Sequence, residues 1–168
     1  DLNDWTAESY SAVAGFTAGV WTPTALGDSV FQSANGQPTL FVSNFSAFGS
    51  KITGKISSSG GGDDDFIGFA LGYQSGDTSN ASANYLLIDW KRGTQTFDFG
   101  SPSSSPGGSA PAGLAVSRVT GIPDADEFWQ HANLDGTVTG YGLEELQRGT
   151  NLNSTGWALN TEYEFTFD

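Results

Sequence analysis

The sequence contains no cysteine and no methionine, and its 168 residues include only six Lys and Arg and a single His. Without cysteine, disulfides and thiolate metal sites are excluded. One histidine excludes a zinc site built from several histidines. The 19 Asp and Glu give a formal net charge of -13, which repels phosphate backbones and anionic membrane surfaces. We therefore expect no nucleic-acid partner.

Long hydrophobic runs and catalytic motifs are also missing. No segment approaches the roughly 18 apolar residues of a membrane span, so we expect no membrane insertion. There is no G-x-S-x-G, no HExxH and no phosphate-binding glycine motif. We expect a protein that is not an enzyme. Because the chain starts at Asp1 without a signal region, we also expect it to be a segment of a longer protein.

Short runs of strand-type residues alternate with Gly, Ser, Asn, Asp and Pro clusters at a spacing of about ten residues. This pattern predicts an all-β sandwich that forms one domain over residues 1–168. The predicted strands are 29–32, 39–42, 50–57, 65–74, 84–91, 94–99, 113–119 and 162–167. Two short helical turns are predicted at 124–131 and 143–147. The Pro, Gly and Ser-rich stretch 100–113 predicts an exposed loop.

The most informative stretch is residues 60–74, GGGDDDFIGFALGYQ, in which three carboxylates follow a glycine turn and lead into a strand. Asp63, Asp64 and Asp65 repel one another unless they are solvated or neutralised. Calcium takes six to eight oxygen ligands and suits such a cluster. The alternative is a solvated acidic loop at the start of a strand, and the run alone does not decide between them.

The loop 75–84 is rich in side-chain oxygens, so Asp77 and Asn80 are candidate ligands for an ion or a sugar hydroxyl. The alternative is an ordinary polar loop between two strands.

Aromatic side chains provide a second kind of candidate, because their faces stack on sugar rings. We expect Trp90 and Trp157 inside the sandwich, which leaves Trp5, Trp21 and Trp129 as candidates for stacking. His131 is expected to pack beside Trp129 and to bond a loop carbonyl.

Several strings carry a family resemblance over nearly the whole chain. They are DDDFIGFALGYQ, NYLLIDWKRGTQ, EFWQHAN and GWALNTEYEFTF, joined by DLNDW and SVFQSANGQPTLFVSN near the start. The sequence resembles the C-terminal domain of thrombospondins, in the form met in secreted bacterial proteins and large calcium-dependent adhesins. The resemblance implies a concanavalin-like, L-type lectin jelly-roll sandwich that binds calcium, is secreted or on the cell surface, serves adhesion and has no catalytic activity.

The acidic triplet of that family falls on Asp63, Asp64 and Asp65, and its Trp-Lys strand end falls on Trp90 and Lys91. This chain adds Asp89, a carboxylate that either joins the calcium cluster or faces water, with water slightly favoured. The resemblance implies a calcium-binding adhesin module that presents a neighbouring ligand-binding domain. The alternative is a calcium-dependent carbohydrate-binding domain that recognises cell-surface glycans or peptides.

In the family, further strands follow the one predicted here at 162–167. An open sheet exposes unpaired backbone groups and apolar surface. We therefore expect the sandwich to be incomplete at its C-terminal end, with the remaining strands supplied by another segment of a larger parent protein.

Overall fold

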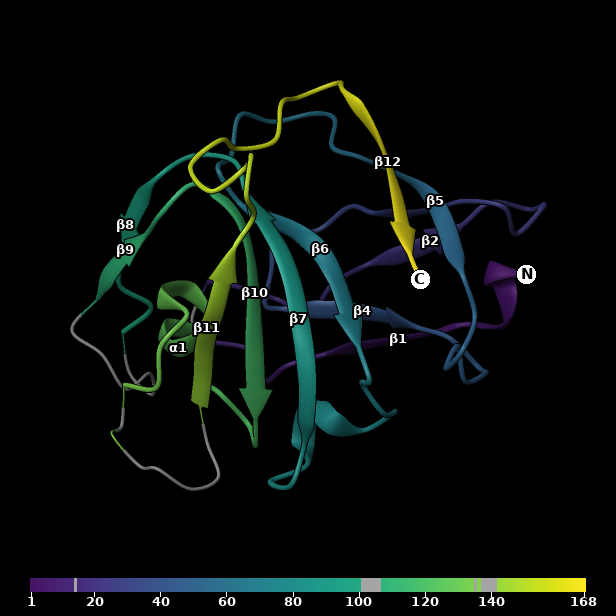
Figure 1. Cartoon of the computed structure of the whole chain (residues 1–168). Coiled ribbons are helices and arrows are strands. Elements are labelled where there is room, and N and C mark those ends of the chain that lie inside the picture. The colour runs from purple at the N-terminus through teal and green to yellow at the C-terminus, as the bar shows by residue number, and fades with distance from the viewer. Residues whose placement is uncertain (14, 101–106, 135, 137–141) are drawn as a thin grey trace.

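The computed structural model describes every residue except 14, 101–106, 135 and 137–141 (Figure 1). Strands dominate the described part of the chain, which confirms the all-β prediction; the lectin-like jelly-roll topology stays a prediction. The strands are β1 (Thr6–Ser9), β2 (Trp21–Pro23), β3 (Val30–Gln32), β4 (Thr39–Val42), β5 (Ile52–Ser57), β6 (Phe66–Leu71), β7 (Asn84–Lys91), β8 (Gln95–Phe97), β9 (Gly108–Ala110), β10 (Gly113–Thr120), β11 (Gly142–Arg148) and β12 (Glu162–Phe167). The helical elements are α1 (Ala125–Gln130) and the short 3-10 turns η1 (Leu2–Asp4) and η2 (Asp77–Ser79).

The centre of the molecule is an antiparallel sheet with the strand order β11-β10-β7-β6. Strands β7 and β10 pair over eight residues, from Asn84 opposite Thr120 to Lys91 opposite Gly113. Side chains alternate between the two faces of a strand, and the odd-numbered residues of β10 from Gly113 to Val119 are all buried. The same alternation on β7 places Asp89 and Lys91 on one face of the sheet.

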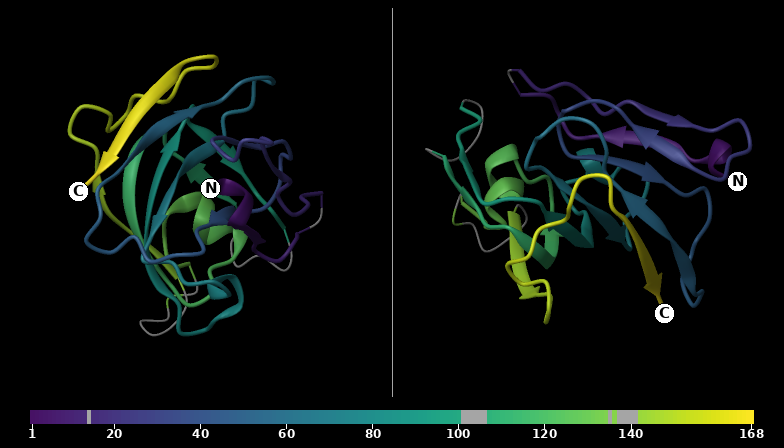
Figure 2. Two further views of the ribbon diagram at one scale, coloured as in Figure 1. Left: turned by 90° about the vertical axis from the view of Figure 1, so that its right-hand side faces the viewer. Right: turned by 90° about the horizontal axis from the view of Figure 1, so that it is seen from above.

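The remaining described strands form two-stranded pairs around this sheet: β1-β4, β2-β3, β5-β12 and β8-β9 (Figures 1 and 2). Strand β12 packs on the sheet through aromatic rings. Tyr163 meets Trp90 at a centroid distance of 4.6 Å, and Phe165 meets Phe69 at 4.4 Å. Such ring pairs add about 1 kcal/mol each beyond the area that they bury.

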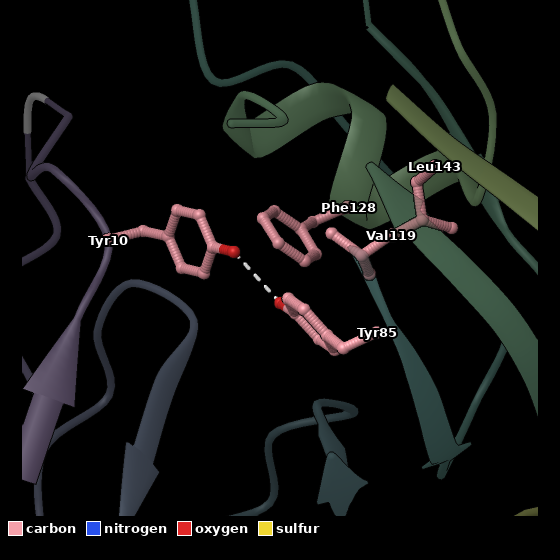
Figure 3. Packing of buried hydrophobic residues seen from close by; sticks show 5 residues of the cluster. All are labelled: Tyr10, Tyr85, Val119, Phe128 and Leu143. Carbon is pink, nitrogen blue, oxygen red and sulfur yellow. Dashed lines mark hydrogen bonds between the residues drawn. The ribbon is translucent and has the colours of Figure 1, made fainter. Parts of the chain in front are cut away.

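A second packing interface joins the sheet to α1 and to the N-terminal segment (Figure 3). Its buried cluster consists of Tyr10, Tyr85, Val119, Phe128 and Leu143. The Tyr10 and Tyr85 hydroxyls are 2.8 Å apart and hydrogen-bonded, and the Tyr10 and Phe128 rings lie edge to face at 4.6 Å. Burial raises the pKa of Tyr10 to about 12. Burial also raises the pKa of Tyr85, so both phenols stay neutral inside this buried cluster.

Helix α1 confirms the helical turn predicted at 124–131. Its N-cap is Asp124, whose carboxylate accepts from the Glu127 amide while the Glu127 side chain accepts from the Asp124 amide. This capping box satisfies two amides that have no partner within the helix. The C-cap that follows the last helical residue is His131, which adopts the left-handed conformation with φ 54°.

The turn predicted at 143–147 is wrong: Gly142–Arg148 is strand β11, paired with β10. Leucines three residues apart and Gly149 just beyond them imitate a helix and its C-cap. Pairing with β10 buries Leu143, which is 1% exposed, so tertiary contacts override the local pattern.

Part of the stretch predicted as a loop at 100–113 is also a strand, because Gly108–Ala110 pairs with β8. Residues 101–106 of that stretch lie outside the described residues. Two further short strands, β1 and β2, have no counterpart in the sequence prediction.

Candidate functional site

The three consecutive aspartates 63–65, called the acidic run below, lie immediately before β6. Asp63 is exposed, and Asp64 and Asp65 are partly buried. One oxygen of the Asp63 carboxylate accepts from the Asp64 amide at 2.9 Å, and the other accepts from the side chain of Asn35 at 2.6 Å. Gly60 precedes the run at φ 101°, a conformation that favours glycine. The loop is therefore held by its own hydrogen bonds as well as by the strand that follows it.

Lys91 lies directly behind the acidic run and is fully buried. Its ammonium group donates to the carbonyl oxygen of Asp64 and, at 3.3 Å, to the side-chain oxygen of Gln95. The ammonium nitrogen also lies 4.2 Å from the centre of the Trp129 ring and 4.9 Å from that of Phe66, a cation-π geometry. Burial lowers the pKa of Lys91, although the nearby carboxylates oppose that shift.

Arg92 lies on the outer side of the same run. Its Nε is 3.8 Å from a carboxylate oxygen of Asp64, and its guanidinium donates to the carbonyl of Asp63 at 3.1 Å. Asp65 is anchored through its backbone, because its carbonyl accepts from the Arg92 amide at 3.2 Å and from the indole of Trp157 at 3.0 Å. Burial raises the pKa of Asp65, the charges of Asp63 and Asp64 raise it further, and Lys91 opposes the shift. The run thus combines clustered negative charge with two basic side chains.

A second polar cluster surrounds His131 and links α1 to the sheet. The His131 Nε2 is 3.0 Å from the carboxylate of Asp89 on β7, and its Nδ1 is 3.2 Å from the carboxylate of Glu145 on β11. Arg148 in turn donates to both oxygens of Glu145, at 2.9 and 2.7 Å. Burial by itself lowers the pKa of His131, but the hydrogen bonds and charges of Asp89 and Glu145 outweigh it, so the pKa is raised.

The structure corrects two expectations at this cluster. Asp89 does not face water, because it is 6% exposed and its Oδ2 pairs with His131. The described hydrogen bonds of Asp89 do not connect it to the acidic run. His131 bonds carboxylates on two strands instead of a loop carbonyl. These partners come from distant parts of the chain, so no local sequence pattern could have indicated them.

The candidates in the loop 75–84 form a compact turn around η2. Asp77 is 4% exposed, and its carboxylate accepts from the Gln74 amide and from the Asn80 side chain, both at 2.9 Å. The side-chain oxygen of Asn80 accepts from the Ser82 amide at 2.9 Å. These groups stabilise the turn, which matches the alternative of an ordinary polar loop.

The tryptophans divide differently from the expectation. Trp129 is 8% exposed and lies under the Lys91 ammonium, so its ring face is not available to a sugar. Trp157 is buried as expected, whereas Trp90 is only partly buried. Trp5 and Trp21 are partly buried and stack on Phe41 at 5.9 and 5.4 Å.

The acidic run has the type of ligand that calcium prefers, but its side chains are not arranged as a coordination shell. Carboxylate oxygens are the hard ligands that calcium prefers. Among the residues that the structure describes, however, no group of three or more His, Cys, Asp or Glu side chains is arranged to hold a metal ion. Lys91 and Arg92 already supply positive charge to the run. Closing a shell around an ion would require the Asp side chains to turn.

Comparison with known proteins identifies the family. The family model of the thrombospondin C-terminal region matches residues 17–168. The chain belongs to the thrombospondin C-terminal family. Over 121 residues, which cover 70% of this chain, it is 31% identical to thrombospondin-2 of Mus musculus and of Homo sapiens, and over the same length it is 29% identical to thrombospondin-2 of Gallus gallus.

This thrombospondin C-terminal domain spans only about 10% of the length of those relatives. The match to the family model confirms, at the level of the family, the resemblance that was based on the acidic run and the Trp-Lys strand end. The described helices include none that is long and apolar enough to cross a membrane.

Proposed function

We propose that this domain is a secreted or cell-surface, calcium-binding β-sandwich module of a bacterial adhesin, which holds neighbouring domains in a fixed orientation during cell adhesion. Membership of the thrombospondin C-terminal family supports this proposal. The observation that carries it is the acidic run, whose carboxylates gather at the surface where the chain enters the central sheet. No catalytic activity is part of the proposal.

Asp63, Asp64 and Asp65 are the proposed ligands. The pKa of Asp65 is raised by burial and by its acidic neighbours, which means that the ionised carboxylate is disfavoured where it lies. A bound divalent cation would supply the positive charge that reverses this effect. Arg92 competes for the carboxylate of Asp64, whereas Lys91 holds the backbone of the run in place from inside. Asp89 is left out of the proposed set because His131 holds its carboxylate.

Neighbouring domains or strands of a larger parent protein are the proposed partners. Among the described strands, β12 pairs with β5 alone, so its second edge is able to accept a strand from another segment. A module that is tied to its neighbours in this way, and stiffened by calcium, would transmit a fixed orientation between them.

Thermal unfolding in millimolar calcium and again in excess chelator tests the proposal. An ion present at 100 times its dissociation constant stabilises the folded state by about 2.7 kcal/mol, which is roughly 5–10 °C in Tm for a domain of this size. Asp64→Asn should reduce that calcium response. Asp168→Asn is the matched control, because it removes the same charge from an exposed ion pair with Lys51.

Two results would count against the calcium proposal. Equal midpoints in calcium and in chelator would make the acidic run a loop that is neutralised by Lys91 and Arg92 and not by an ion. A calcium response that Asp64→Asn and Asp168→Asn lower to the same extent would reflect net charge and would remove Asp64 from the ligand set.

Carbohydrate binding is the second candidate function. The groups first considered for it do not favour it, because Asp77 and Asn80 bond each other and Trp129 is buried.

A further inference from the structure

Asn35 ties the segment between β3 and β4 to the acidic run. Its side-chain amide donates to a carboxylate oxygen of Asp63 at 2.6 Å. Asp63 thus receives a donor from a segment that lies 28 residues earlier in the sequence. The Asn35 side chain is exposed and belongs to an irregular stretch of backbone, so water reaches it.

The residue that follows Asn35 is a glycine, and the packing requires it. A Cβ atom at position 36 would lie 2.3 Å from the carbonyl oxygen of Thr17. Every other residue type would therefore clash with backbone at this point. Asn35 is the only asparagine in the sequence that precedes a glycine. The fold thus preserves an Asn-Gly dipeptide directly beside the acidic run.

Asn-Gly is the dipeptide most prone to deamidation. Glycine has no side chain to hinder the attack of its own amide nitrogen on the side chain of the preceding asparagine. Within the described structure the Gly36 amide donates no hydrogen bond, and the adjoining bridge to Thr17 uses the amide of Gln37, at 2.8 Å, instead. No hydrogen bond therefore has to break before the Gly36 nitrogen attacks, and the exposed amide of Asn35 is open to water.

We propose that Asn35 is a site of spontaneous deamidation, which converts the tether of Asp63 into a fourth carboxylate beside the acidic run. The Gly36 nitrogen loses its proton and bonds to Cγ of Asn35, while the bond from Cγ to Nδ2 breaks and Nδ2 leaves as ammonia. Water then opens the cyclic imide at either carbonyl carbon and gives aspartate or isoaspartate. The net reaction consumes one water and releases one ammonia, and no group is oxidised or reduced.

The product changes the acidic run in two ways. A carboxylate replaces the donor 2.6 Å from Asp63, so an attraction becomes a repulsion between like charges. The same carboxylate adds a hard oxygen ligand, and the number of charged ligands tunes the affinity of a site for calcium. The second change rests on the calcium binding proposed above, whereas the deamidation itself does not.

Incubation of the folded wild-type protein at mildly alkaline pH, followed by peptide mapping with mass spectrometry, tests the modification. Asn44 is the control within the same molecule, because it is also exposed but is followed by the bulky Phe45. We expect aspartate and isoaspartate to appear at position 35 at least about ten-fold faster than at position 44. Equal rates at the two positions, or conversion of Asn35 in urea but not in the folded protein, would overturn the proposal.

Asn35→Asp reproduces one of the two products and tests its effect on the acidic run. In excess chelator its Tm should lie below that of Asn44→Asp, which adds the same charge to another exposed loop, and the difference should shrink at high salt. In excess calcium Asn35→Asp should gain more in Tm than the wild type gains. A calcium gain in the wild type that Asn35→Asp does not enlarge would refute the role of the new carboxylate as a ligand.

Failure of the modification site and failure of the calcium proposal give different results. Fast conversion of Asn35, together with a Tm that responds to calcium in neither the wild type nor Asn35→Asp, would support the modification site and remove the calcium module. A normal calcium response together with equal conversion of Asn35 and Asn44 would do the reverse.

Discussion

Lys91 and His131 are two buried basic side chains on the same side of the central sheet, yet their pKa values shift in opposite directions. Burial dominates at Lys91 and lowers its pKa, because its hydrogen-bond acceptors are the neutral oxygens of Asp64 and Gln95. At His131 the acceptors are the carboxylates of Asp89 and Glu145, and the pKa is raised. Nearby negative charge alone does not offset the effect of burial on the pKa of a basic group, whereas direct bonds to carboxylates do.

Removing Lys91 should have the largest effect. Lys91→Ala leaves a cavity over the Trp129 ring and removes the tether of the acidic run, so we expect a loss of about 4 kcal/mol in the free energy of unfolding by urea. Lys91→Met should lose less, because it fills the space without a charge. Lys51→Ala, at an exposed pair with Asp168, is the control and should lose under about 1 kcal/mol. Equal losses for Lys91→Ala and Lys51→Ala would show that the buried ammonium has no structural role.

Breaking the His131 cluster should have the next largest effect. Asparagine tolerates the left-handed backbone at this position, so His131→Asn removes the ring without adding backbone strain. The Asp89 carboxylate is then buried without its partner, and we expect a loss of about 3 kcal/mol at pH 6. In a double-mutant cycle with Asp89→Asn, the second substitution should cost little once the first is made. Strictly additive losses would mean that the two residues do not interact.

The smallest predicted effect is the pH dependence. Since the folded pKa of His131 is raised above its ordinary value of 6.5, its stabilising contribution is complete below pH 6.5 and is lost as the pH rises through the folded pKa. Melting temperatures should therefore fall as the pH rises above 6.5, and His131→Asn should flatten that fall. Lys91, with a lowered pKa, contributes the opposite slope in the range just below pH 10.5. A steeper fall in His131→Asn than in the wild type would contradict this assignment.

Much of the fold was predictable, because β4 and β7 are short runs of strand-type residues bounded by turn residues, and β12 alternates polar and aromatic side chains within the strand itself. The edges of the molecule were not. The segment forming β11 carries helix-like leucine spacing, and β1 is a strand only because β4 lies beside it. The family and the acidic run were also readable from the sequence. The position of Lys91 on the inward face of β7 was implied by alternation, but its contact with Trp129 depends on where α1 docks.

The cluster at His131 was beyond sequence reasoning, because it combines residues from elements that are far apart in the chain, namely β7, α1 and β11. Contacts of this kind become visible only when the elements have been placed in space.

The pairing of β5 with β12 has a consequence for the order in which the molecule folds. Lys55 and Glu162, whose side chains form an ion pair across these strands, are 107 residues apart in sequence. Contacts of such long range form slowly, because the entropy of closing the loop is lost before the contact repays it. The local pairing of β6 with β7 is able to form early, whereas the aromatic contacts of β12 on the sheet must wait until nearly the whole chain is available. During synthesis on a ribosome, the face that carries Phe69 would stay open until Phe165 emerges, and this is the interval in which the domain is most exposed to misfolding.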